Sequence, residues 1–129
     1  MKAIVTALLL AATLTAAAQT NTMATDDRPA VNLIKALQSE NAGVVASAIF
    51  HTAKYDLVIG SAYHHHLVGE LIRLANRTDD ATLRDRAILA IRAMQNPQRL
   101  AGLDISNTKD ADVFFACLAE RCGEAVVSR

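Results

Sequence analysis

Apolar residues recur at helical spacing through most of the chain, and two stretches of this pattern resemble each other. One stretch, LIKALQSENAGVVASAIFHTA, begins at Leu33, and the other, LIRLANRTDDATLRDRAILAI, begins at Leu71. Their first residues align at an offset of 38, and Ala48 aligns with Ala87 at an offset of 39. One extra residue in the second turn accounts for the difference. A unit of this length with two amphipathic helices is typical of helical solenoids, so the pattern predicts an all-α fold with two helix–turn–helix repeats.

The pattern predicts four helices in the two repeats and a fifth near the C-terminus. The expected helices run from 29 to about 40, from 41 to between 55 and 59, from 62 to 76, from about 80 to 96, and from 106 or 107 to about 122. Asn41 and Ser61 are expected helix caps, and Gly60 is an expected stop. No stretch alternates regularly between apolar and polar residues, so no strand is predicted. The residues expected to face the interior are Val31, Ile34, Leu37, Val44, Val45, Ala48, Ile49, Thr52, Leu67, Val68, Leu71, Ile72, Ala75, Leu83, Ala87, Ala90, Ile91, Met94, Val113, Phe114, Cys117 and Leu118.

The segment LRDRAILAI resembles the second helix of a HEAT-type repeat. That pattern has an aliphatic residue, an arginine, an alanine and a leucine at helical spacing, and Leu83, Arg84, Ala87 and Ile91 fill those places. An arginine at this place can bond the carbonyl groups of the neighbouring turn. A structural role is therefore expected for Arg84.

The first copy keeps the apolar positions of the HEAT-type pattern at Val44 and Ala48, and departs from it at Val45 and Thr52. The resemblance covers most of residues 30–97, and the chain looks like small exported HEAT-like proteins of bacteria. It implies a short right-handed α-solenoid, with two helix–turn–helix repeats and a C-terminal helix. It implies no catalytic residue and no cofactor.

The N-terminus has the pattern of a secretory signal peptide. Lys2 supplies a positive end, an apolar run follows, and small residues at 16–18 suit cleavage after Ala18. No cysteine lies near that point, which excludes lipoprotein processing. We therefore expect a signal peptide over 1–18, a polar leader over 19–28 and a helical domain over 29–129. A soluble periplasmic or secreted bacterial protein without a membrane anchor is expected.

Charge and composition argue against several classes of partner. Lys plus Arg number 13 and Asp plus Glu number 13, and the chain has no Trp and few aromatic residues. A nearly neutral chain is not steered toward nucleic acid or an anionic membrane. Without Trp, a stacking platform for sugars or bases is also unexpected.

The run His64, His65, His66 is the candidate metal site. Neutral imidazole binds Zn, Cu or Ni. Two ligands on one helix are favoured at i and i+4, whereas adjacent residues fan out by about 100° each around a helix. The alternative is a polar first helical turn that happens to contain histidine. On that interpretation the whole run is dispensable for folding.

Candidate catalytic groups are weaker still. The sequence has neither the G-x-S-x-G motif nor a glycine-rich phosphate loop. The pairs Asp79–Asp80 and Asp110–Asp112 fall at expected helix starts, where capping explains them. We therefore expect a protein that is not an enzyme.

Cys117 and Cys122 are the only cysteines. Export to an oxidising compartment favours a disulfide between them. Five residues on a continuous helix give about 7.5 Å of rise, so the bridge can close only if the helix ends between them. Gly123 is a reason for it to end. The alternative is two reduced thiols, with Cys117 buried and Cys122 loose.

The sequence supports two alternative functions. The first is an interaction module for a protein partner, since solenoid repeats expose a face to partners. One narrow apolar stripe cannot bury both of the adjacent rings of Phe114 and Phe115. One ring is therefore expected to be an exposed anchor or to lie at a homodimer contact. The second is a small metal-binding protein that uses the histidine run.

Overall fold

A computed structural model describes residues 28–60 and 62–123 of the chain. These residues form five α-helices and no strand, which confirms the all-α prediction. The expected signal peptide, the leader before Arg28, the Ser61 cap and the last six residues lie outside the described residues. The helices are α2 (Arg28–Leu37), α3 (Ala42–Val58), α4 (His64–Arg77), α5 (Ala81–Gln95) and α6 (Ala111–Leu118), with a 3₁₀ turn at Pro97–Leu100 and a π-helical turn at Ala119–Gly123.

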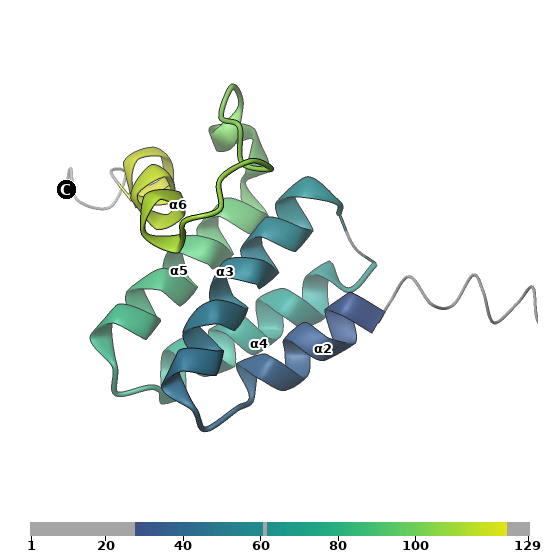
Figure 1. Ribbon diagram of the computed structural model, residues 1–129, viewed down its shortest axis with the longest axis vertical. Helices are drawn as coiled ribbons and strands as arrows, with labels where there is room; N and C mark the ends of the chain where they lie inside the picture. Colours follow the sequence, from purple (N-terminus) through teal and green to yellow (C-terminus); the bar gives the residue numbers. More distant parts are fainter. Residues whose placement is uncertain (1–27, 61, 124–129) are drawn as a thin grey trace, which may run out of the picture.

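The first four helices form two antiparallel pairs that lie against each other (Figure 1). Short turns join α2 to α3 and α4 to α5. Between the pairs, α2 packs on α4 and α3 packs on α5. The shorter α6 lies across the α5 side and also contacts α3. One long side of the α2–α3 pair therefore has no helix of the described residues against it.

Capping side chains set where three of the helices begin. The Oδ1 atom of Asn41 accepts hydrogen bonds from the backbone N–H groups of Gly43 and Val44, at 2.9 and 3.2 Å. Asp80 caps α5 in the same way, and Asp110 caps α6. Each cap satisfies N–H groups that have no partner inside the helix. The Asn41 prediction is confirmed, and the last helix begins after Asp110 rather than at 106 or 107.

The first helix ends three residues earlier than expected. The N–H groups of Gln38 and Ser39 bond the carbonyl groups of Lys35 and Ala36, each at 3.1 Å, so the last turn tightens to i−3 bonding. The helix stop expected at Gly60 is confirmed, because Gly60 follows α3 with a φ of +73°. Glycine adopts this left-handed conformation without the steric cost that other residues incur.

Two arginines bond backbone carbonyl groups at helix ends. Arg84 donates to the carbonyl of Thr78 at 3.0 Å, which confirms its expected structural role. Arg77, near the end of α4, donates to the carbonyl of Leu37 at 2.6 Å. Since Leu37 is the last residue of α2, this bond joins the C-terminal ends of two neighbouring helices.

The core lies between the two helix pairs and under α6. Both small residues expected to be equivalent, Ala48 and Ala87, are buried. Three of the expected interior positions in the pairs are wrong: Val31, Val44 and Ile72 are exposed, while Leu74 takes a buried place on α4. A neighbouring helix reaches only part of the circumference of α3 or α4, so some apolar residues remain at the surface.

The last helix is fixed by aromatic packing and by one ion pair. Phe114 and Phe115 are both buried, which corrects the expectation that one ring would be left outside, and Val113 is exposed instead. The ring of Phe114 meets that of Phe50 edge-on at 5.1 Å between centroids. The Arg86 guanidinium lies over the Phe115 ring, 4.9 Å from its centroid.

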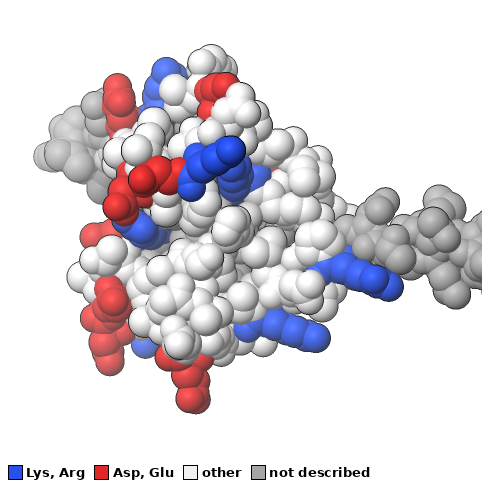
Figure 2. Space-filling view, viewed as in Figure 1, with Lys and Arg blue, Asp and Glu red and all other residues white. Residues whose placement is uncertain are grey.

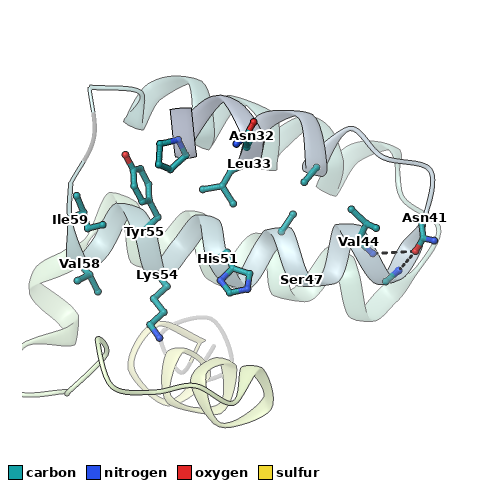
Figure 3. Close-up of a pocket in the computed structure, with 14 residues that line it drawn as sticks. Asn32, Leu33, Asn41, Val44, Ser47, His51, Lys54, Tyr55, Val58 and Ile59 are labelled. Carbon is teal, nitrogen blue, oxygen red and sulfur yellow. Dashed lines mark hydrogen bonds between the residues drawn. The ribbon is translucent and has the colours of Figure 1, made fainter. Parts of the chain in front are cut away.

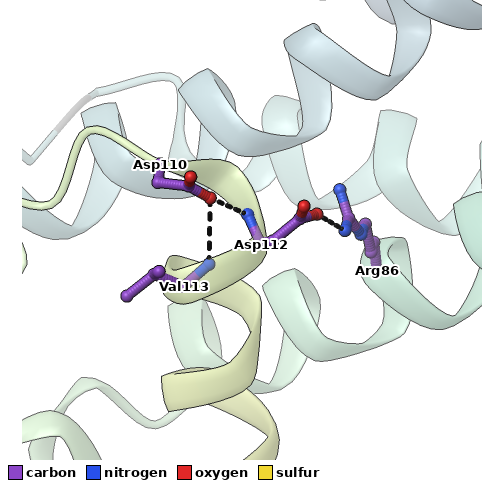
Figure 4. Close-up of polar contacts among 4 residues, drawn as sticks. All are labelled: Arg86, Asp110, Asp112 and Val113. Atoms are coloured by element: carbon purple, nitrogen blue, oxygen red, sulfur yellow. Dashed lines mark hydrogen bonds and ion pairs between the residues drawn. The ribbon is translucent and has the colours of Figure 1, made fainter.

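The two aspartates at the start of α6 have separate structural roles (Figure 4). Asp110 accepts from the N–H groups of Asp112 and Val113, at 2.8 and 3.2 Å. The carboxylate of Asp112 pairs with Arg86 of α5. Both carboxylates are therefore explained by helix capping and by the docking of α6 on α5.

The two cysteines have the opposite burial from the one expected. Cys117 is half-buried, Cys122 is buried, and both are free. The α-helix ends at Leu118, between the two cysteines, but the backbone stays helical through the π-helical turn at Ala119–Gly123. Burial raises the pKa of the Cys122 thiol, and the positive charges of Arg99 and Arg92 partly oppose that shift. The Cys117–Cys122 disulfide stays a prediction.

None of the helices in residues 28–60 and 62–123 is both long and apolar enough to cross a bilayer.

Candidate functional site: an open groove along α3

Helix α3 is apolar on nearly all of its sides. Its 17 residues include only two charged side chains, Lys54 and Asp56. One side, with Val45, Ile49 and Ala53, is buried in the core. A helix that is apolar all round is typical of a protein interior, where neighbours cover every side. The neighbouring helices α4, α5 and α6 cover only part of the surface of α3, so a groove remains.

The groove lies between α2 and α3 and has a volume of about 970 Å³. Figure 3 shows Leu33 of α2 and the side chains of α3 lining the space between the two helices. The α3 residues that line it repeat at helical spacing along the whole helix. They are Gly43, Val44, Ser47, Ala48, His51, Lys54, Tyr55 and Val58, with Ile59 just beyond the end of the helix.

Three aliphatic residues of the groove are unusually exposed. Val44 is 42%, Val58 is 46% and Ile59 is 69% accessible to solvent. They lie at the two ends of the groove, and the small Ser47 and Ala48 lie between them. The surrounding face carries few charges over α3 in Figure 2. The exposed apolar surface of the groove is therefore concentrated at its two ends.

The residues of the groove that carry a basic side chain, His51 and Lys54, both lie on α3. His51 is exposed, and Lys54 points from α3 toward the segment that contains α6 (Figure 3). The Lys54 ammonium donates to the carbonyl of Thr108 at 2.7 Å and lies 5.5 Å from the Phe50 ring centroid. None of the described residues that line the groove is acidic. The groove is therefore an apolar surface with a cationic edge.

The histidine run does not form a cluster of ligands. His64 begins α4 and is half-buried, whereas His65 and His66 are exposed. The rings of His64 and His65 meet edge-on at 5.3 Å, and that of His66 lies 5.7 Å from Tyr63. Among residues 28–60 and 62–123, no three His, Cys, Asp or Glu side chains lie close enough together to hold one ion.

His64 has a partner that its sequence neighbours do not indicate. Its Nδ1 atom lies 2.7 Å from Oδ2 of Asp56, whose side chain is only 6% exposed. The other carboxylate oxygen of Asp56 is buried without a hydrogen-bond partner among the described residues. A hollow of about 480 Å³ beside the pair is also lined by Met94 and Pro97. The pair orients one imidazole and joins α3 to α4.

The periodicity of apolar residues predicts that Val44 faces the interior, so periodicity alone does not predict the groove. Two signals in the sequence point to it. The helix 42–58 has two charged residues in 17, and the stripe Val44, Ala48, His51, Tyr55, Val58 keeps helical spacing on a second side. An amphipathic helix needs one such stripe, so a second one indicates a second neighbour.

Comparisons of the chain with protein-family models, with curated protein sequences and with solved structures give no match.

Proposed function

We propose that this protein is an exported, non-enzymatic interaction module, and that the groove between α2 and α3 is the surface to which its protein partner binds. The observation that carries the proposal is the second apolar stripe of α3, from Val44 to Val58, which is covered only in part by α2 and leaves Val44 and Val58 exposed. Covering it would remove apolar surface from water, which is the main favourable term in most protein association.

The proposal includes the HEAT-like architecture and the export of the chain. The pairing of α2 with α4 and of α3 with α5 supports two stacked helix pairs. In such a stack each pair is covered by the next one, and an end pair keeps one side open. The groove is on that open side, and the sequence of residues 1–18 supports export.

Site-specific photo-crosslinking in the periplasm of a Gram-negative expression host, or better in the native organism, tests the proposal. A photoreactive residue replaces Ser47 in the groove, and a control places it at Asp85, which is exposed on α5. One discrete protein adduct from position 47 and none from position 85 supports the proposal. Equal adducts from both positions contradict it. Edman sequencing of the exported protein is expected to start at Gln19.

A metal-binding function is the second candidate, and the Asp56–His64 contact favours it. A histidine that binds a metal commonly donates its other ring N–H to a carboxylate, which fixes the tautomer and orients the ring. The 2.7 Å contact at Nδ1 leaves Nε2 of His64 as the nitrogen available to a metal. Equilibrium dialysis with Zn²⁺ or Cu²⁺ tests this function. Stoichiometric binding lost in His64→Ala supports it, and equal uptake by the His65→Ala/His66→Ala protein assigns the binding to His64 alone.

A further inference from the structure

Resting on the proposed function, we infer that the occupant of the groove is a single amphipathic helix of the partner, with an acidic side chain placed against Lys54. The shape, length and charge of the groove each narrow the class of ligand.

The shape favours one helix. The groove is bounded by two antiparallel helices, and small side chains, Ala36, Ser47 and Ala48, line part of it. Small residues let a third helix approach closely, and bulkier groups at the ends hold it in place. An amphipathic helix that lays its apolar face into a hydrophobic groove is a recurring mode of peptide recognition.

The length sets how much helix can be bound. Apart from Gly43, Val44 and Val58 are the first and last α3 residues that line the groove. The fourteen residue steps of helix between them span about 21 Å, so a partner helix of about four turns would cover the groove. Apolar anchors at i, i+3 or i+4, i+7 and i+11 would face it.

The charge selects an acidic side chain. Lys54 is the one cationic lysine or arginine among the described lining residues, and no acidic residue lines the groove with it. An ammonium group has three donors, and the structure assigns one of them to the carbonyl of Thr108. A carboxylate from the partner would meet the remaining donors at the edge of an apolar surface.

Two other occupants fit less well. A second copy would bring a concave groove and a second Lys54 against the first, without an acidic group among the described lining residues of either copy. Residues 19–27, the segment expected to remain after cleavage, read QTNTMATDD and offer few apolar side chains for an apolar groove. Both occupants are outcomes of the test below.

The probes are fluorescein-labelled, 16-residue helical peptides with Leu, Ile, Phe or Met at the four anchor positions and Glu, Gln or Lys at the position next to the apolar face. Binding to residues 19–129 is measured by fluorescence anisotropy. At least one Glu peptide is expected to bind, and to bind about fivefold more tightly than its Gln counterpart, the upper range for a partly exposed ion pair. The Lys counterpart is expected to bind most weakly.

The variants separate the apolar contacts from the charge. Val44→Asp places an acid at the start of α3 and Val58→Lys places a base at its end, so each suits the helix dipole and should fold. Both are expected to weaken binding about tenfold or more, although they change the charge in opposite directions. Ile72→Lys is the matched control, because Ile72 is 43% exposed and lies outside the groove. Lys54→Gln keeps a donor for Thr108 and is expected to abolish the preference for Glu over Gln.

Each outcome decides between the statements. If no peptide loses affinity in Val44→Asp and Val58→Lys, both the inference and the groove of the proposed function are overturned. If the groove variants lose binding but Glu, Gln and Lys peptides bind equally, the proposed function stands and the acidic-helix inference is overturned. If sedimentation shows a wild-type dimer that Val58→Lys dissociates, or if residues 19–27 must be removed before any peptide binds, another occupant replaces the partner helix.

Discussion

Nδ1 of His64 lies 2.7 Å from Oδ2 of Asp56, and this contact joins the last turn of α3 to the first residue of α4. The two residues lie on either side of the turn that contains Gly60. The Asp56 side chain is only 6% exposed, so the hydrogen bond is shielded from solvent on the Asp56 side. The contact argues against the expectation that the whole histidine run is dispensable for folding, which stays a prediction.

Replacing His64 with Ala is therefore expected to lower the free energy of unfolding by about 1–3 kcal/mol, the cost of leaving a buried acceptor unsatisfied. His65→Ala is the matched control, because His65 is the next residue and is exposed. A change within about 0.5 kcal/mol is expected for the control. Urea denaturation followed by circular dichroism measures both. Equal midpoints for the two variants would show that the contact contributes nothing.

Ala87→Leu and Ala48→Leu are expected to differ, although both alanines are buried. Ala87 is enclosed by the core, so the added carbons would overpack it at a cost of about 1–3 kcal/mol. Ala48 also lines the groove, into which a larger side chain can extend, so a cost below about 1 kcal/mol is expected. Thermal denaturation of the two variants compares them. A larger loss from Ala48→Leu would mean that the groove is closed in solution.

Arg77→Ala is expected to lower the free energy of unfolding by about 1 kcal/mol, because it removes the hydrogen bond to the carbonyl of Leu37. Lys35→Ala is the control: Lys35 lies in the last turn of α2, is exposed, and makes no side-chain hydrogen bond or ion pair with another described residue. The control removes a favourable charge at a helix end but no such bond, and a cost below about 0.5 kcal/mol is expected. Denaturant midpoints of the two variants test the difference. Equal losses of unfolding free energy in the two variants would mean that Arg77 acts only through its charge and not through the hydrogen bond to Leu37.

Alkylation of the cysteines is expected to proceed in a fixed order. Cys117 is half-buried, whereas Cys122 is buried and the pKa of its thiol is raised by that burial. The thiolate is the reactive form, so a raised pKa leaves less of it at a given pH. As the pH rises toward 9, the labelling rate of Cys122 should therefore increase. This increase should occur at a higher pH than the corresponding increase for a free thiol. Because burial disfavours the thiolate of Cys122 in the folded state, the contribution of this thiol to the free energy of unfolding is retained at low pH. That contribution is lost as the pH rises.

Intact-mass analysis after iodoacetamide treatment of the unreduced, folded protein measures that order. One rapid adduct at Cys117 and a slow second one at Cys122 is the expected result. Faster labelling of Cys122 would contradict its burial. No adduct until a reductant is added would instead establish the Cys117–Cys122 disulfide.

Much of the helical framework could be predicted from the sequence, because its signals are local. Asn41 caps α3 through N–H groups two and three residues away, and Gly60 follows α3 in a left-handed conformation. Each of these features depends on residues close in sequence. The spacing of Leu83, Ala87 and Met94 likewise identified buried positions of α5.

The candidate site could not be predicted in the same way, because it depends on which sides of a helix acquire neighbours. Helix α3 is apolar all round, so periodicity alone could not assign Val44 to the groove and Val45 to the core. The Asp56–His64 contact spans a turn whose path the sequence did not specify. The burial of both Phe114 and Phe115 depends on Phe50 and Arg86, which lie on other helices.

The central claim is that the outer side of α3 is an open apolar groove that receives a partner helix. Methyl-resolved NMR of the mature protein, titrated with the best-binding Glu peptide, tests it most directly. The account predicts large chemical-shift changes for the methyl groups of Leu33, Val44 and Val58, and little change for Ile72 and Val113, which are exposed elsewhere. Shifts at Ile72 and Val113 that equal those of the groove methyl groups, or groove methyl groups that do not move, would contradict it.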